Sequence, residues 1–109
     1  MEASRPRRSK SDSAIQRKAE EVLIGWLSAQ LGLSLRPYAF GIDGCTMNVD
    51  GWYQDGNRVI IAEAWAHIGR AKSAQKNKVT TDVLKLAYIT EHLTRSKPPP
   101  QVECYYVFA

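Results

Sequence analysis

An Asp-Gly pair near the middle of the chain constrains the fold more than any other feature. Asp55 and Gly56 can supply the backbone geometry that a two-residue hairpin loop needs. The run 45–53 before them alternates roughly between apolar and polar residues, and the run 58–67 after them is rich in β-branched residues. The sequence therefore predicts an antiparallel pair of strands with Asp55 and Gly56 as the loop.

Signals for two helices and two further strands surround this hairpin. Apolar residues recur at helical spacing over 13–31 and again over 72–94. Residues 35–42 suit an edge strand because they contain a proline, and 101–109 form a strand of the buried type after three prolines. The order helix, strand, strand, strand, helix, strand predicts one α/β domain with a mixed sheet, in which the second helix makes a right-handed crossover.

The distribution of charge and length divides the chain into a tail and a domain. The net charge is +4, and four of the fifteen basic residues lie in the first ten positions. We expect a disordered basic tail over 1–12, either simply solvated or attracted to the phosphates of a nucleic acid. Residues 13–109 suffice for one hydrophobic core, and they end on the apolar pair Val107 and Phe108, as a truncated domain would.

The remaining composition favours a cytoplasmic protein. The longest apolar run, 59–62, is far shorter than the roughly 20 residues of a membrane span. The basic N-terminus is not followed by the apolar stretch of a secretory signal. We therefore expect a reducing compartment, no membrane partner, and buried free thiols at Cys45 and Cys104.

Two carboxylates near the predicted hairpin suggest a metal site. With the loop given above, Asp50 opposes Ile61 and Asn48 opposes Glu63. Opposed residues share a sheet face, so Asp50 and Glu63 are diagonal neighbours roughly 7–8 Å apart. Two carboxylates at that range can share Mg²⁺. The alternative is a pair of exposed acids on a solvated face, but Glu63 interrupts an apolar run with no evident local reason.

Together, these carboxylates and the predicted elements resemble a known protein family. The chain has a carboxylate late in one strand, then a turn, then an apolar strand that ends in Glu63-Ala64-Trp65, with a helix on either side. This pattern is similar to that of the PD-(D/E)XK nucleases, which include restriction endonucleases and Holliday-junction resolvases. The resemblance covers 13–109 and implies a restriction-endonuclease-like αβββαβ core, a mixed sheet flanked by helices. It implies that Asp50 and Glu63 bind the metal, and that Glu20 matches the first-helix glutamate of the resolvase-like branch.

The family's lysine, which helps to position and activate the attacking water, falls at Trp65, and an indole can do neither. Some members take this lysine from the following helix. There Gln75, Lys78 and Asp82 lie three and four residues apart along one stripe. We therefore predict Lys78 as the lysine, with Gln75 beside it in the catalytic set, although Lys78 could also be one more solvated lysine. The other lysines of that helix are Lys72, Lys76 and Lys85.

The resemblance implies a Mg²⁺-dependent endonuclease that cleaves nucleic-acid phosphodiesters, with DNA favoured over RNA. The alternative is a catalytically inactive domain of the same fold that binds nucleic acid, a partner protein or a second copy of itself, and Trp65 supports that alternative. A third possibility is a structural domain of a larger assembly.

Overall fold

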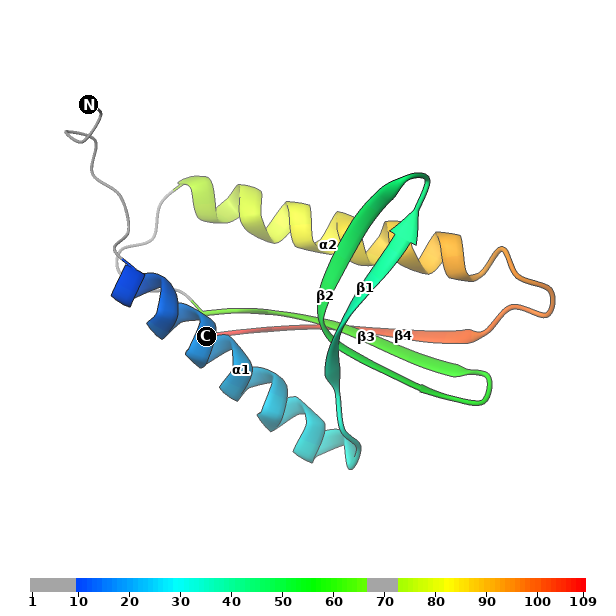
Figure 1. Cartoon of the computed structure of the whole chain (residues 1–109), viewed down its shortest axis with the longest axis horizontal. Coiled ribbons are helices and arrows are strands. Elements are labelled where there is room, and N and C mark those ends of the chain that lie inside the picture. The colour runs from blue at the N-terminus through cyan, green and yellow to red at the C-terminus, as the bar shows by residue number, and fades with distance from the viewer. Residues whose placement is uncertain (1–9, 67–72) are drawn as a thin grey trace.

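The computed structural model describes residues 10–66 and 73–109, and the predicted order of elements is confirmed (Figure 1). Helix α1 begins at Lys10, before the predicted start at residue 13, and most of the predicted tail lies outside the described residues. The elements in chain order are α1 (Lys10–Leu31), β1 (Arg36–Ile42), β2 (Cys45–Asp55), β3 (Arg58–Trp65), α2 (Ser73–Leu93) and β4 (Gln101–Phe108).

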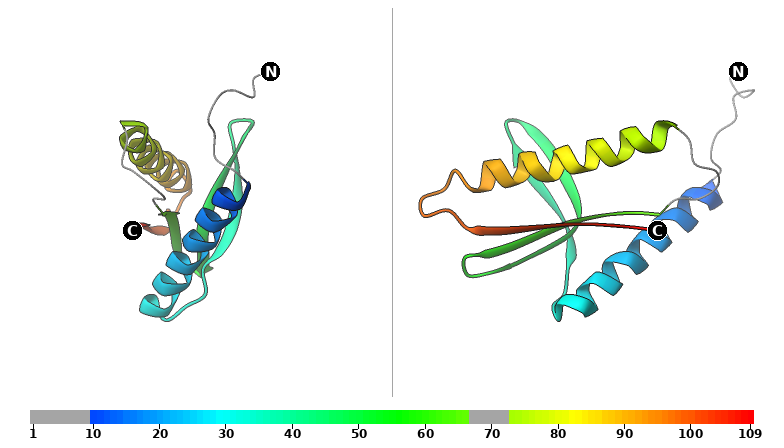
Figure 2. Two further views of the ribbon diagram at one scale, coloured as in Figure 1. Left: turned by 90° about the vertical axis from the view of Figure 1, so that its left-hand side faces the viewer. Right: turned by 180° about the vertical axis from the view of Figure 1, so that it is seen from behind.

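The four strands form one mixed sheet in the order β1-β2-β3-β4. The first three strands are antiparallel to their neighbours, whereas β4 runs parallel to β3. Parallel neighbours need a long crossover, and α2 provides it. The two helices pack on opposite faces of the sheet (Figures 1 and 2). The protein is thus a mixed α/β domain, as predicted.

Strand β3 is the centre of the core because both of its faces are covered. Ile60 packs in the cluster that contains Ile24 and Leu27 of α1, and Ile61 packs in the cluster that contains Ile89 of α2. This explains the continuous apolar run of the strand, since a strand covered on both faces has no solvent side to alternate with. Burying each such isoleucine contributes about 1.5–3 kcal/mol. Glu63 is an acid on this buried strand.

The predicted loop of the β2–β3 hairpin is wrong by one position. Asp55 pairs with Arg58, so the loop consists of Gly56 and Asn57. Gly56 has a φ of 61°, and a glycine at the first loop position meets that requirement at no steric cost. The register therefore moves by two residues. Asp50 and Glu63 are the next residues after the last pair, Gly51 with Ala62, so they are closer neighbours than the predicted diagonal pair.

A β-bulge interrupts β2 next to Asp50. Arg36 pairs with Trp52 but Tyr38 pairs with Val49, so β2 carries one more residue than β1 in this stretch. Pro37, between the two β1 partners, has no N–H to donate to the ladder. Beyond the bulge the β1–β2 hairpin curves away from β3 and passes α2 (Figure 1). Asp50 lies in the bulged stretch of β2.

Both cysteines are free, but the prediction that they are buried is wrong. Cys45, at the start of β2, and Cys104, on β4, are exposed. Cys104 lies on β4, the last strand in the sheet order, and every side chain of β4 is at least partly exposed. No helix within the described part of the chain is long and apolar enough to cross a membrane.

Candidate functional site

Strands β2 and β3 separate at Asp50 and Glu63, and the two carboxylates bridge the gap. The last backbone pair on this side is Gly51 with Ala62. Beyond it, Oε2 of Glu63 accepts the N–H of Asp50 at 3.0 Å. Oδ2 of Asp50 accepts the N–H of Ala64 at 2.9 Å. The structure therefore brings the two predicted acids together, each bonded to the backbone of the other's strand.

Glu63 is only 2% exposed, and a lysine of α2 compensates its charge. The Nζ of Lys85 lies 2.6 Å from Oε1 of Glu63 and also donates to the carbonyl oxygen of Asn48 at 2.8 Å. Burial raises the pKa of the Glu63 carboxyl, the nearby Asp50 adds to this, and the hydrogen bond from Lys85 offsets only part of it. The helix lysine in contact with the carboxylate pair is thus Lys85 rather than the predicted Lys78.

Lys78 binds an acid of its own helix, Asp82. Its Nζ donates to both oxygens of Asp82, at 3.1 and 2.9 Å. Asp82 is buried, and its Oδ2 also accepts the hydroxyl of Tyr106 at 3.0 Å. Tyr106 is the β4 partner of Glu63 in the parallel register. Lys78 therefore belongs to a cluster next to the carboxylate pair, and its bonds go to Asp82.

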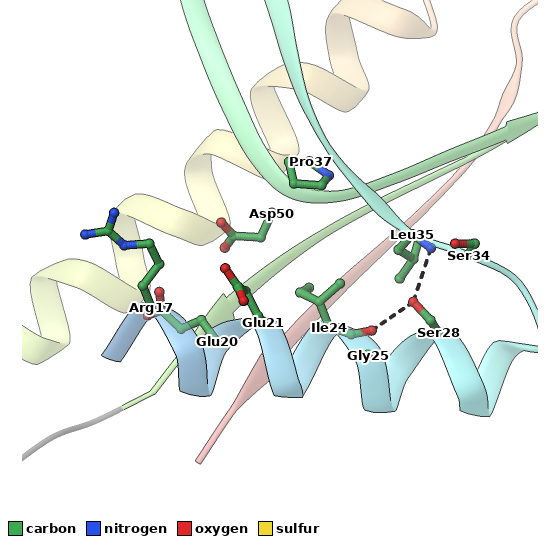
Figure 3. Close-up of a pocket in the computed structure, with 10 residues that line it drawn as sticks. All are labelled: Arg17, Glu20, Glu21, Ile24, Gly25, Ser28, Ser34, Leu35, Pro37 and Asp50. Carbon is green, nitrogen blue, oxygen red and sulfur yellow. Dashed lines mark hydrogen bonds between the residues drawn. The ribbon is translucent and has the colours of Figure 1, made fainter. Parts of the chain in front are cut away.

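Glu20 of α1 reaches the end of β3. Its Oε2 accepts the N–H of Ala66 at 3.2 Å and the side-chain amide of Gln16 at 3.3 Å. Glu20 and Asp50 both line one groove of about 600 Å³ (Figure 3). The groove lies between α1 and the strands β1 and β2, and its lining residues also include Arg17, Glu21, Ile24 and Pro37. The groove gives access to Asp50 from the α1 side of the sheet.

The other residues considered from the sequence are Gln75, two further lysines near the start of α2, and Trp65. The side chain of Gln75 lies outside the described residues, as do those of Lys72 and Lys76. Trp65 is half-buried at the end of β3 and pairs with Phe108 of β4. It follows Glu63 by two positions, so its indole stands on the same strand face as that acid.

Sequence reasoning did not select Lys85 and did not detect Tyr106. Lys85 stands seven residues after Lys78 and three after Asp82, so helical spacing puts it on the same stripe and could have indicated it. Tyr106 had no such signal, because its place beside Glu63 depends on the β3–β4 register.

The carboxylates fit a hard cation in chemistry but do not form a full ligand cage. Within residues 10–66 and 73–109, no group of three or more His, Cys, Asp or Glu side chains is arranged to hold a metal ion. Mg²⁺ commonly needs only one or two carboxylates, since it keeps several waters and binds substrate phosphates. Asp50 and Glu63 supply two carboxylates, and three of their four oxygens accept a backbone N–H or contact Lys85. No protein-family model, curated protein or solved structure matches the chain.

Proposed function

We propose that this protein is a Mg²⁺-dependent endonuclease of the PD-(D/E)XK type that hydrolyses nucleic-acid phosphodiesters. The observation that carries the proposal is the Asp50–Glu63 pair, two acids bonded across separating strands beside a groove. An acid on a strand buried on both faces costs stability, and such perturbed groups concentrate at functional sites.

The restriction-endonuclease-like core is part of the same proposal. Its support is the αβββαβ order, the antiparallel β1–β3 meander, the parallel β4 and the helices on opposite faces. A polyanionic substrate suits the net charge of +4, and DNA is the substrate we favour over RNA.

Each residue of the site would have a distinct task. Asp50 and Glu63 would hold Mg²⁺, and the bound ion would supply Lewis-acid polarisation of the phosphate and a more acidic water. Glu20 lines the same groove as Asp50 and would add a third carboxylate on the side from which substrate could approach. Lys85, within 2.6 Å of Glu63, would stabilise negative charge that develops at the phosphate. Lys85 would thus take the role of the family's lysine, whose position in this sequence is occupied by Trp65.

The second candidate is a catalytically inactive domain of the same fold that binds nucleic acid or a partner protein. Two observations favour it. Trp65 stands where the family has its lysine, and Oε1 of Glu63 already has a counter-charge in Lys85. In that case the carboxylates would serve mainly to tie β2 to β3.

Cleavage assays with charge-removing variants separate the two candidates. Plasmid, single-stranded and branched DNA are incubated with the protein in Mg²⁺, Mn²⁺ or EDTA. A nuclease cleaves with the metals, and Asp50→Asn or Glu63→Gln removes cleavage while DNA binding persists. Glu91→Gln is the matched control, because Glu91 is exposed and pairs with Arg95 far along α2.

Two results would contradict the nuclease. Equal cleavage by the wild type and Glu63→Gln would point to a contaminating enzyme. Binding without cleavage under every metal condition would support the inactive domain instead.

A further inference from the structure

The inward-facing stripe of α2 changes character along the helix. From Leu86 onward the stripe is apolar, with Leu86 and Ile89 buried in the core. Up to residue 85 it is polar, and this polar half carries Lys78, Asp82 and Lys85 at spacings of four and three residues, which put them on the same side of the helix. This polar half lies over Glu63 and Tyr106, partners on the neighbouring strands β3 and β4.

Asp82 is the buried centre of this polar half. It is 3% exposed, and its oxygens accept two hydrogen bonds from Lys78 and one from Tyr106. A buried carboxylate without such partners would cost several kcal/mol. The hydroxyl of Tyr106 comes from a different element, so the position of Asp82 is fixed by the sheet as well as by its own helix.

This arrangement differs from an ordinary surface pair. Arg95 and Glu91 also lie four residues apart on α2, but their side chains are 59% and 60% exposed. In the Lys78–Asp82 pair the lysine is 42% exposed and the acid only 4%. The side chain of Lys78 can therefore be reached from solvent, while the carboxylate that orients it is buried.

Lys78 keeps its positive charge next to the Asp50–Glu63 pair. Burial alone would lower the pKa of Lys78, but the hydrogen bonds and charge of Asp82 outweigh it, so the pKa is raised and the lysine stays protonated at neutral pH. Glu63 and Glu20 also act on this pKa through their charges. With two of its donors directed at Asp82, the ammonium retains a third donor for another acceptor.

We propose that Asp82 and Tyr106 are positioning residues that hold Lys78 as a fixed cation for a backbone phosphate of the nucleic acid, next to the Asp50–Glu63 pair. The identity of the ligand rests on the proposed function, whereas the positioning relationship rests on the Asp82 contacts. A lysine held in this way loses less side-chain entropy when it meets a phosphate.

The test is a double-mutant cycle measured by binding as well as by cleavage. Labelled duplex and single-stranded DNA are titrated by fluorescence polarisation in EDTA over a series of salt concentrations. Lys78→Ala should weaken binding about threefold to tenfold and reduce the salt slope by about one. Asp82→Asn should weaken binding in the wild type but have no further effect in the Lys78→Ala background, because it acts through Lys78.

Two further variants complete the design. Tyr106→Phe deletes one hydroxyl and should show a smaller loss that also vanishes in the Lys78→Ala background. If a urea titration shows that Asp82→Asn does not fold, Tyr106→Phe takes its place in the double-mutant cycle. Lys97→Ala is the matched control, an exposed lysine in the loop beyond the far end of α2 (Figure 1), and should leave binding unchanged.

The outcomes distinguish this inference from the nuclease proposal. Coupled loss of binding without any metal-dependent cleavage keeps the positioning of Lys78 and rejects the nuclease. A wild type that cleaves while Lys78→Ala binds and cleaves equally well rejects the positioning and keeps the nuclease. Equal losses from Asp82→Asn in both backgrounds, or no DNA binding by the wild type, also overturn the inference.

Discussion

Asp50 and Glu63 each accept a hydrogen bond from the strand that carries the other, at 2.9 and 3.0 Å. The two side chains thereby take over from the backbone ladder, whose last pair is Gly51 with Ala62. Because backbone N–H groups fix both carboxylates, their positions depend on the register of β2 and β3 rather than on side-chain rotamers alone.

Lys85 should stabilise the fold mainly when no metal is present. Lys85→Ala leaves the buried Glu63 without its cation, and we expect a loss of about 1–3 kcal/mol in the free energy of unfolding in EDTA, since Lys85 is itself 27% exposed. Mg²⁺ should stabilise Lys85→Ala more than the wild type, because it replaces the missing counter-charge. Urea denaturation with and without Mg²⁺ measures both effects.

Lys85→Arg is the control for that comparison, because it keeps the positive charge. It should lose less stability in EDTA than Lys85→Ala. A Lys85→Ala variant that is as stable as the wild type, or that gains nothing extra from Mg²⁺, would contradict the prediction.

The stability contributed by Glu63 should fall as the pH rises. Burial raises the pKa of Glu63 above its usual 4.5, so between that value and the raised pKa the folded state binds more protons than the unfolded state. Stability must then decrease as pH increases through this window. The free energy of unfolding of the wild type, relative to Glu63→Gln, should therefore decline from pH 4.5 upward in urea titrations without metal. A rising difference would mean that Lys85 lowers the pKa more than burial raises it.

A side chain at Gly51 should destabilise the fold, because Leu35 and the α1 residue Ile24 pack directly over this position. A Cβ at this position would lie 3.2 Å from the Cβ of Leu35. It would lie 3.4 Å from the Cβ of Ala62 and 3.4 Å from the Cδ1 of Ile24. We expect Gly51→Ala to destabilise the protein by about 1–3 kcal/mol, as overpacking does elsewhere. Gly41→Ala is the matched control, since a Cβ there meets nothing within 4 Å. Equal stability of the two variants in urea would show that α1 can shift.

The basic N-terminus should contribute to nucleic-acid affinity through charge alone. Replacing Arg5, Arg7 and Arg8 by serine keeps the chain length and removes three positive charges. If all three lie near phosphates, the salt slope of DNA binding should fall by about three, and by less if only some do. Fluorescence polarisation across a salt series measures the slope, and an unchanged slope would show that the tail does not contact the nucleic acid.

The order and approximate limits of the elements could be predicted because they rest on local information. Helical spacing located α1 and α2, and the β-branched residues of 58–67 indicated the strand β3. The turn around Asp55 and Gly56 identified a hairpin but not its loop, since Gln54-Asp55-Gly56-Asn57 offers two overlapping pairs of turn residues. The two-residue change in register kept Asp50 and Glu63 as neighbours because side chains alternate with a period of two.

The sequence by itself determined that Asp50 and Glu63 come together and that α2 supplies a lysine. Tertiary structure alone decided that Lys85 contacts Glu63 and that Lys78 is held by Asp82 and Tyr106. Several lysines share one stripe of α2, and which of them meets an acid depends on where the helix crosses the sheet. Tyr106 reaches Asp82 because β4 pairs with β3 in one particular parallel register. Crossing point and register are set by packing between distant segments, which local patterns of residues do not encode.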